Sequence, residues 1–199
     1  MHRSIGAASA VATWGSAAAA LAALAWVGIS LESIVRPGEH DYRDGLILLP
    51  WVLTMAAFVA LHRVQRHRAG FIEKAGFWVA MAMMALTGIG ALGMVIGADG
   101  LTPLAFPIGP MLWIPSMVAW GVGTARAGVM PPWVGAGLAL CQPLTIGLAL
   151  ALSPISPVVE RGSYTGALAN GLVLAGLAMA LYALRSGNRH LTRVAAARV

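Results

Sequence analysis

The chain is built from long stretches without charged residues, separated by short polar segments. A helix that crosses the ~30 Å hydrocarbon core of a bilayer needs about 20 consecutive apolar residues. Six stretches meet this requirement, and none comfortably holds two crossings once proline-rich ends are removed. We therefore predict an all-α, polytopic integral membrane protein, a six-helix bundle that forms a single transmembrane domain over residues 1–199. The predicted spans are about 7–30, 46–62, 76–97, 108–125, 132–153 and 164–184, followed by a basic tail at 185–199.

The composition excludes most other classes of protein. Of the 199 residues, 59% are hydrophobic and 10% are charged, whereas about 25% charged residues is typical of a soluble domain. The net charge of +6 does not indicate nucleic-acid binding, because the basic residues border the apolar stretches as they do in membrane proteins. The single cysteine, Cys141, cannot form an internal disulfide or a multi-cysteine metal site.

The basic residues predict the orientation in the membrane, because Lys and Arg accumulate in cytoplasmic loops. With six spans, ten of the 13 Lys and Arg residues fall on the side of both termini, and three fall on the other side. Six of the seven acidic residues fall on that other side, and Glu73 is the exception. We therefore predict a multi-pass protein of the cell membrane with both termini in the cytoplasm.

Stripes of small residues predict where helices pack closely. In lipid, helices associate through close van der Waals contacts, so small residues mark their interfaces. One stripe on the third span consists of Gly90, Gly93 and Gly97, and one on the first span consists of Ser9, Thr13, Ser16 and Ala20. We interpret both as contacts within the bundle. For the first span, whose whole surface is small, the alternative is a contact with another membrane subunit.

Two intramembrane polar residues, Gln142 and Asn170, are candidate ligand contacts. Gln142 lies near the centre of the fifth span beside Pro143, which cannot donate a hydrogen bond to the carbonyl of Ala139. With Thr145 and Asn170, it predicts a small polar site inside the bundle. The structural alternative is that Gln142 only bonds a neighbouring helix.

Trp113 and Trp120 are the other candidate ligand contacts. They follow a segment with four prolines in residues 103–115, which predicts that the fourth helix begins near Pro110. The apolar segment before it would then cover a pocket that opens to the outer leaflet. Such a pocket would bind an apolar or lipid-like ligand. The alternative is ordinary anchoring of tryptophan at the membrane interface.

The predicted outer side carries four carboxylates that are weak catalytic candidates: Asp41, Asp44, Asp99 and Glu160. Carboxylates that converge can perform acid–base chemistry, but here a solvated loop paired with arginines is the alternative. No metal or cofactor is predicted, since the spacing fits no ligand motif and the common catalytic motifs are absent from the sequence. No ionisable residue lies near the middle of a span, which argues against a proton-coupled transporter.

Two functions agree with these patterns. The first is a non-enzymatic binding or transport component, or an accessory subunit of a membrane complex. In length, number of spans and Ala-rich first helix (Ala8-xxx-Ala12), the chain is similar to the substrate-capture subunits of energy-coupling-factor vitamin transporters. That similarity covers architecture and implies a binding component, without vitamin-site residues to carry over. The second is an integral-membrane enzyme acting on a lipid or isoprenoid, with the outer carboxylates as general acid. The sequence leaves open whether the protein is an enzyme.

Overall fold

The computed structural model describes residues 2–38, 40, 42–157 and 164–196, and within these ranges it contains helices and no strand. The all-helical prediction is confirmed. The six long helices are α1 (His2–Val35), α3 (Leu48–Gln65), α4 (Phe71–Val95), α5 (Gly109–Ala127), α6 (Pro132–Ala151) and α7 (Leu168–Ala196). The short ones are α2 (Tyr42–Leu46), η1 (Asp99–Leu101), the π-helical η2 (Leu104–Ile108) and η3 (Thr165–Ala167).

In the described part of the chain, five segments are long and apolar enough to cross a membrane. They are Ser9–Val35, Tyr42–Gln65, Phe71–Val95, Pro132–Ala151 and Thr165–Ser186. The 19-residue helix α5 is not among them, because its prolines, glycines and Arg126 lower its mean hydropathy. The structure thus supports a multi-pass membrane protein, while the sixth crossing, the side of the termini and the identity of the membrane stay predictions.

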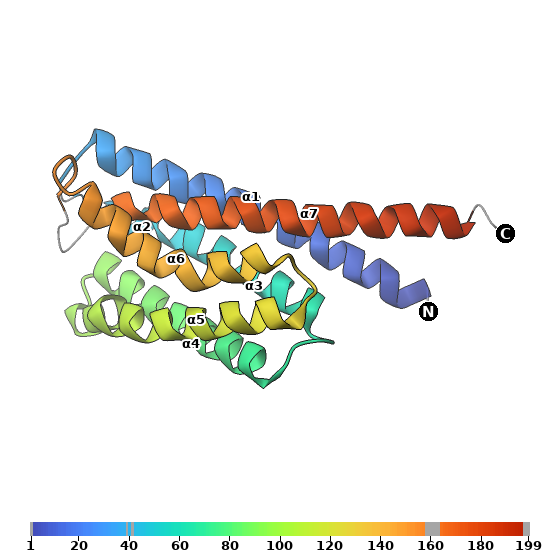
Figure 1. The fold of residues 1–199 in the computed structure, drawn as a ribbon. Helices are drawn as coiled ribbons and strands as arrows, with labels where there is room; N and C mark the ends of the chain where they lie inside the picture. The colour runs from blue at the N-terminus through green and yellow to red at the C-terminus, as the bar shows by residue number, and fades with distance from the viewer. Residues whose placement is uncertain (1, 39, 41, 158–163, 197–199) are drawn as a thin grey trace.

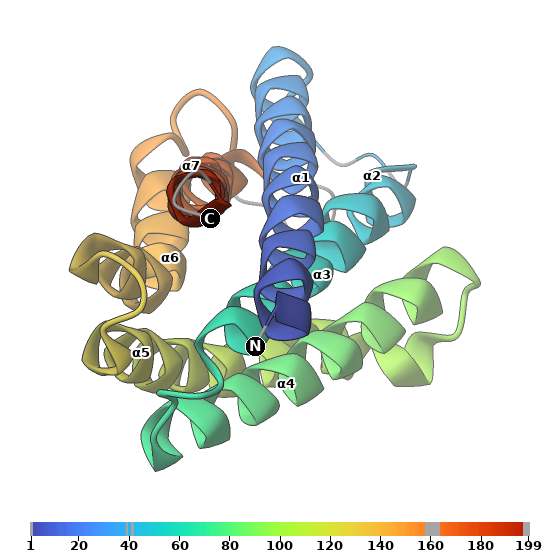
Figure 2. The same ribbon diagram turned by 90° about the vertical axis from the view of Figure 1, so that its right-hand side faces the viewer.

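The six long helices form a ring. Each contacts the next in the order α1, α3, α4, α5, α6 and α7, and α7 closes the ring on α1 (Figure 2). Both termini lie at the same end of the bundle, where α7 extends beyond the other helices (Figure 1). We call this the terminal end, and the opposite end, which carries η3 and α2, the loop end.

Aromatic side chains fill much of the interior between α1, α3, α4 and α5. The ring of Trp51 lies 5.9 Å from that of Trp26 and 4.9 Å from that of Trp113, in edge-to-face arrangements. Nearer the terminal end, the ring of Trp120 lies 4.7 Å from that of Phe58. Offset and edge-on aromatic pairs of this kind stabilise beyond their buried area. Trp113 and Trp120, both buried, are therefore part of the core.

The glycine stripe of α4 receives the proline-rich segment. A Cβ added at Gly90 would lie 2.2 Å from the backbone nitrogen of Ala105 in η2, and one at Gly93 would lie 2.5 Å from Cβ of Leu101 in η1. This confirms the interpretation of Gly90 and Gly93 as contacts within the bundle. Gly97 has φ +73° and ends the helix, a conformation that glycine adopts without steric cost.

The small-residue face of α1 is also used inside the bundle. The Ser16 hydroxyl donates to the carbonyl of Ala178 in α7 at 2.9 Å. A Cβ at Gly15 would lie 2.3 Å from Cβ of Ala60 in α3. Ala20 is exposed, and a contact of α1 with another subunit stays a prediction.

Candidate functional site

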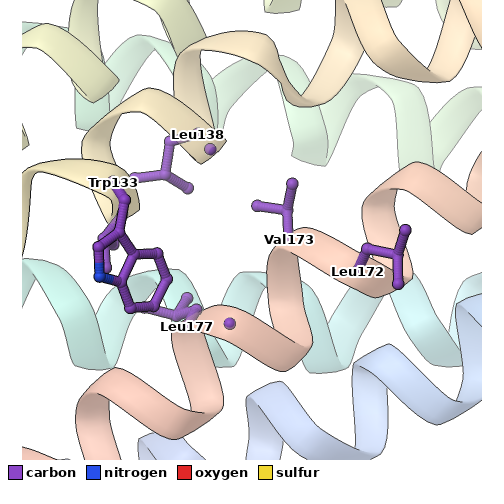
Figure 3. A pocket seen from close by; sticks show the side chains of 8 residues that line it. Trp133, Leu138, Leu172, Val173 and Leu177 are labelled. Carbon is purple, nitrogen blue, oxygen red and sulfur yellow. The ribbon is translucent and has the colours of Figure 1, made fainter.

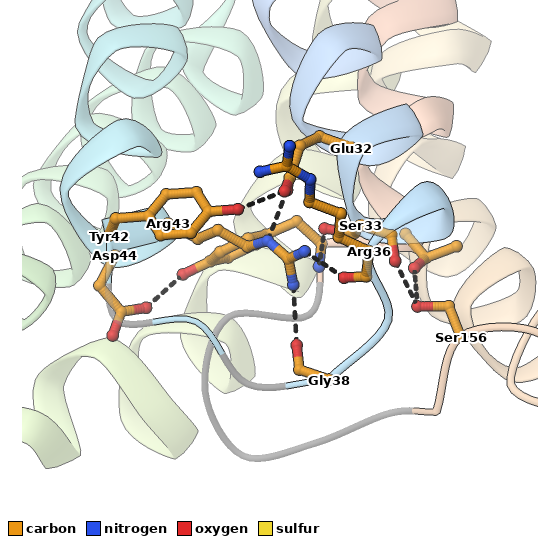
Figure 4. A network of polar contacts seen from close by, with 10 residues as sticks. Glu32, Ser33, Arg36, Gly38, Tyr42, Arg43, Asp44 and Ser156 are labelled. Carbon is orange, nitrogen blue, oxygen red and sulfur yellow. Dashed lines mark hydrogen bonds and ion pairs between the residues drawn. The ribbon is translucent and has the colours of Figure 1, made fainter.

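A buried arginine organises the loop end of the bundle (Figure 4). Arg43 on α2 is fully buried, and its Nε lies 2.5 Å from the carboxylate of Glu32 near the end of α1. Its other nitrogens donate to the carbonyls of Gly38, at 2.8 Å, and Arg36. The Tyr42 hydroxyl also donates to Glu32. The guanidinium therefore holds the α1–α2 connection in place. The charge of Arg43 thus has a structural role.

The loop between α6 and α7 is tied to the same end of α1 by buried hydroxyl groups. The Ser156 hydroxyl donates to the carbonyl of Ser33 at 2.9 Å, and it accepts from Thr165 at 2.9 Å. The Ser30 hydroxyl donates to the carbonyl of Thr165 at 2.5 Å. These bonds close the ring of helices at the loop end.

The candidate catalytic carboxylates are only partly within the described residues. Asp44 is buried and accepts a hydrogen bond from the Tyr164 hydroxyl at 2.8 Å. Burial and the nearby Asp44 carboxylate raise the pKa of Tyr164. Asp99 is exposed on η1, whereas Asp41 and Glu160 lie outside the described residues. A catalytic role for this group stays a prediction, and the contact made by Asp44 fits the structural alternative.

A polar cluster joins the middle of α6 to the first turn of α7. Asn170 Oδ1 accepts from Cys141 Sγ at 2.8 Å, Thr145 Oγ1 at 3.0 Å and Gln142 Nε2 at 3.3 Å. Both amide side chains are 6% exposed. Gln142 and Asn170 thus come together as the sequence predicts. Within the described residues, no hydrogen bond is seen to the amide nitrogen of Asn170 or to Oε1 of Gln142.

An apolar groove of about 240 Å³ lies beside this cluster, between the same two helices (Figure 3). Its lining is Trp133, Val134, Gly137, Leu138, Leu172, Val173, Gly176 and Leu177. The groove begins one helical turn from Gln142 and Asn170, and it extends toward the α5–α6 connection. The predicted pocket was expected beneath the proline-rich segment, near Trp113 and Trp120. The groove instead uses Trp133 at the start of α6.

A second buried polar cluster lies at the terminal end, where α3 stops and α4 begins. Glu73 Oε1 accepts from Gln65 Nε2 at 2.8 Å and from Trp120 Nε1 at 3.0 Å, and it lies 3.0 Å from His62 Nδ1. Gln65 Nε2 also donates to Thr124 Oγ1 at 3.0 Å. We call these five residues the Glu73 cluster. In the charge pattern of the sequence Glu73 is only an exception, and polar Gln65 and Thr124 at the ends of apolar stretches are the signal that could have pointed to the cluster.

No set of three or more His, Cys, Asp or Glu side chains in the described part of the chain is arranged to hold a metal ion. Comparison of the chain with protein families, with curated proteins and with solved structures finds no match. The described residues therefore define only a class, an all-helical protein in which five helices are long and apolar enough to cross a membrane.

Proposed function

We propose that the protein is a six-span membrane protein, with both termini cytoplasmic, that binds a neutral lipid-like ligand between α6 and α7 without catalysing a reaction. The observation that carries this proposal is the position of the apolar groove, one helical turn from the amide pair Gln142 and Asn170. One helix pair thus offers a surface for an apolar chain and, next to it, two groups for hydrogen bonds.

The shape of the groove supports selection among apolar molecules. An apolar chain gains little by leaving lipid for an equally apolar protein surface, so van der Waals fit must provide the selectivity. Gly137 and Gly176 leave room on the two helices, and the half-exposed indole of Trp133 forms one wall. A Cβ at Gly137 would lie 3.5 Å from Val173 Cγ1, an ordinary contact distance. The position therefore has space that a larger side chain would fill.

The polar cluster supports a neutral ligand. The amide nitrogen of Asn170 can donate a hydrogen bond and Oε1 of Gln142 can accept one. Gln142 lies near the middle of α6, whereas Asn170 lies in the first turn of α7, and a charged group at the bilayer centre costs roughly 2.5–3.5 kcal/mol or more. We therefore expect a hydroxyl or carbonyl group on the ligand rather than a phosphate or carboxylate.

Two arguments support the sixth crossing and the orientation. Helix α5 has 19 residues, which corresponds to about 28 Å of α-helix and nearly matches the hydrocarbon thickness. In the ring it lies between α4 and α6, both of which are apolar enough to cross. Six crossings place both termini on one side, and the excess of Lys and Arg there favours the cytoplasm.

The proposal is tested by photolabelling the protein in a bilayer with two diazirine probes, a long-chain alcohol and a phospholipid. We expect the alcohol to label α6 and α7 at the groove, in competition with excess unlabelled alcohol, whereas the phospholipid labels the lipid-exposed surface without saturation. Gly137→Leu fills the groove and should lower the competed labelling at least tenfold. Gly147→Leu is the matched control, because that position is exposed on the same helix and faces open space.

Two labelling results would contradict the proposal. If unlabelled alcohol does not compete, or if Gly137→Leu and Gly147→Leu behave alike, the groove is only part of the surface that lipids cover. Circular dichroism and gel filtration of both variants establish that they fold before the labelling is compared.

A further inference from the structure

We propose that the Glu73 cluster binds one alkali-metal cation, held by the carboxylate of Glu73 and the amide oxygen of Gln65. This site is at the terminal end of the bundle and is independent of the groove between α6 and α7. The site has two buried acceptors without a partner, one carboxylate whose ionisable neighbour is His62, and the ends of three helices around it.

The cluster has more hydrogen-bond acceptors than donors. Oε2 of Glu73 and Oε1 of Gln65 are both buried and have no hydrogen-bond partner within the described residues. The two side chains are fully buried, and the hydrogen bond from Gln65 Nε2 to Glu73 Oε1 joins them. A buried acceptor without a partner is costly, and the great majority of such groups are paired in native proteins. A single positive ion near this hydrogen bond satisfies both oxygens together.

The single carboxylate of the cluster, that of Glu73, favours a monovalent cation. The N–H groups of Gln65 and Trp120, and the His62 ring, all contact Oε1 of Glu73, and Oε2 has no such contact. His62 is the ionisable side chain in contact with Glu73, and it forms an ion pair only when the imidazole is protonated. Arg63, Arg66, Lys74 and Arg126 are exposed, and no ion pair from them to Glu73 is seen in the described chain. A monovalent ion neutralises one carboxylate, whereas a divalent ion would leave an excess charge in the interior.

The chemistry of the ligands indicates a hard cation. Carboxylate and amide oxygens favour alkali and alkaline-earth ions over softer transition metals. Two helices, α3 and α5, end beside the cluster, at Gln65 and Ala127. Their C-terminal carbonyls carry partial negative charge, which attracts a cation, whereas the N-terminus of α4 at Phe71 carries partial positive charge and acts in the opposite sense.

Glycines fix the cluster in one geometry. A Cβ at Gly123 would lie 2.4 Å from Cα of Glu73, and a Cβ at Gly76 would lie 2.5 Å from the backbone nitrogen of Trp120. Helices α4 and α5 therefore meet backbone to backbone at the carboxylate, and Glu73 cannot swing out to solvent without separating them. His62, which is 15% exposed and stacks on Phe77 at 4.0 Å, is the member of the cluster nearest solvent.

The test measures thermal unfolding of the detergent-purified protein in lithium, sodium, potassium or choline chloride at constant ionic strength and pH. We expect at least one alkali cation to raise the melting temperature saturably, by about 5–10 °C at a hundred times its dissociation constant, relative to choline. Glu73→Gln keeps the shape of the side chain and should abolish this increment. Glu32→Gln, which removes a carboxylate at the opposite end, should lower the melting temperature in every salt but keep the increment.

Equal melting temperatures in choline and in all alkali salts would overturn the proposal, as would an increment that survives in Glu73→Gln. A proton, rather than a cation, occupies the site if acidification in choline gives the same stabilisation and alkali ions then add nothing; that result also overturns the proposal. If Glu73→Gln does not fold, equilibrium dialysis of the wild-type protein against radioactive sodium and against rubidium decides. One ion bound per chain supports the site, and no binding of either refutes it.

Discussion

Arg43→Met is expected to be among the most damaging substitutions at the loop end. It removes the ion pair with Glu32 and the donors to the carbonyls of Gly38 and Arg36. Removing one partner of a buried ion pair costs about 3–5 kcal/mol, because the other partner is left unpaired. The Glu32 side chain is 28% exposed and regains some hydration, so we expect the lower end, about 3 kcal/mol. For a chain of this length that corresponds to a fall of about 6–12 °C in melting temperature.

The assay is thermal unfolding in detergent micelles, with three further variants that separate the interactions. Arg43→Lys retains the charge but not the fork of donors, and we expect roughly half the loss. Glu32→Gln alone, and combined with Arg43→Met, completes a double-mutant cycle, in which we expect coupling of at least about 1 kcal/mol. Additivity within about 0.5 kcal/mol, or an unchanged melting temperature in Arg43→Met, would show that Arg43 does not hold the α1–α2 connection.

Three further predictions use single positions. Gly97→Ala should cost about 1 kcal/mol in thermal unfolding because of its φ of +73°, whereas Gly100→Ala, which faces open space, should cost little. Cys141 is buried, so a maleimide should label it only after unfolding in SDS, and labelling of the native protein would contradict the packing of α6 on α7. The raised pKa of Tyr164 means that the folded protein favours the protonated phenol. That stabilisation is complete below the unfolded pKa of about 10 and is lost as the pH rises above it. The melting temperature of the wild type should therefore fall more steeply between pH 9 and 11 than that of Tyr164→Phe, and parallel curves would refute the assignment.

The helices were predictable from the sequence because a chain that crosses a bilayer has to be helical where it is long and apolar. Backbone groups in hydrocarbon must be hydrogen-bonded within the segment, so a long uncharged stretch forms a helix. Proline is favoured in the first turn of a helix, and some prolines mark helix starts in this way, although Pro115 and Pro143 lie inside α5 and α6. Pro110 and Pro132 behave in this way, because α5 begins at Gly109 and α6 begins at Pro132 itself.

The burial of particular charges was not predictable from the same pattern. A charge pattern places a residue near a span boundary, but its solvent exposure depends on which helix packs over it. Arg43 is buried because the connection from α1 to α2 wraps its carbonyls around the guanidinium. Glu73 is buried because Gly123 allows α5 to lie against it. Both contacts join segments that are not neighbours on one helix face, so helical periodicity contains no signal for them.

Glycines mark the helix surfaces around the candidate site in the sequence. The residue type alone, however, does not distinguish a close helix crossing from a groove. At the α5–α6 crossing, a Cβ on Gly121 would lie 2.4 Å from the carbonyl oxygen of Gly135, so the two backbones already occupy the space. At the loop end, a Cβ on Gly166 would lie 2.2 Å from the carbonyl oxygen of Thr145, which brings η3 against α6. From there α6 and α7 separate toward the terminal end (Figure 1), and Gly137 faces only the side chain of Val173, at a distance that a methyl group would tolerate. Three of these glycines therefore serve close packing, whereas the space at Gly137 belongs to the groove. We therefore expect substitution of Gly137 to change the proposed ligand binding without preventing folding.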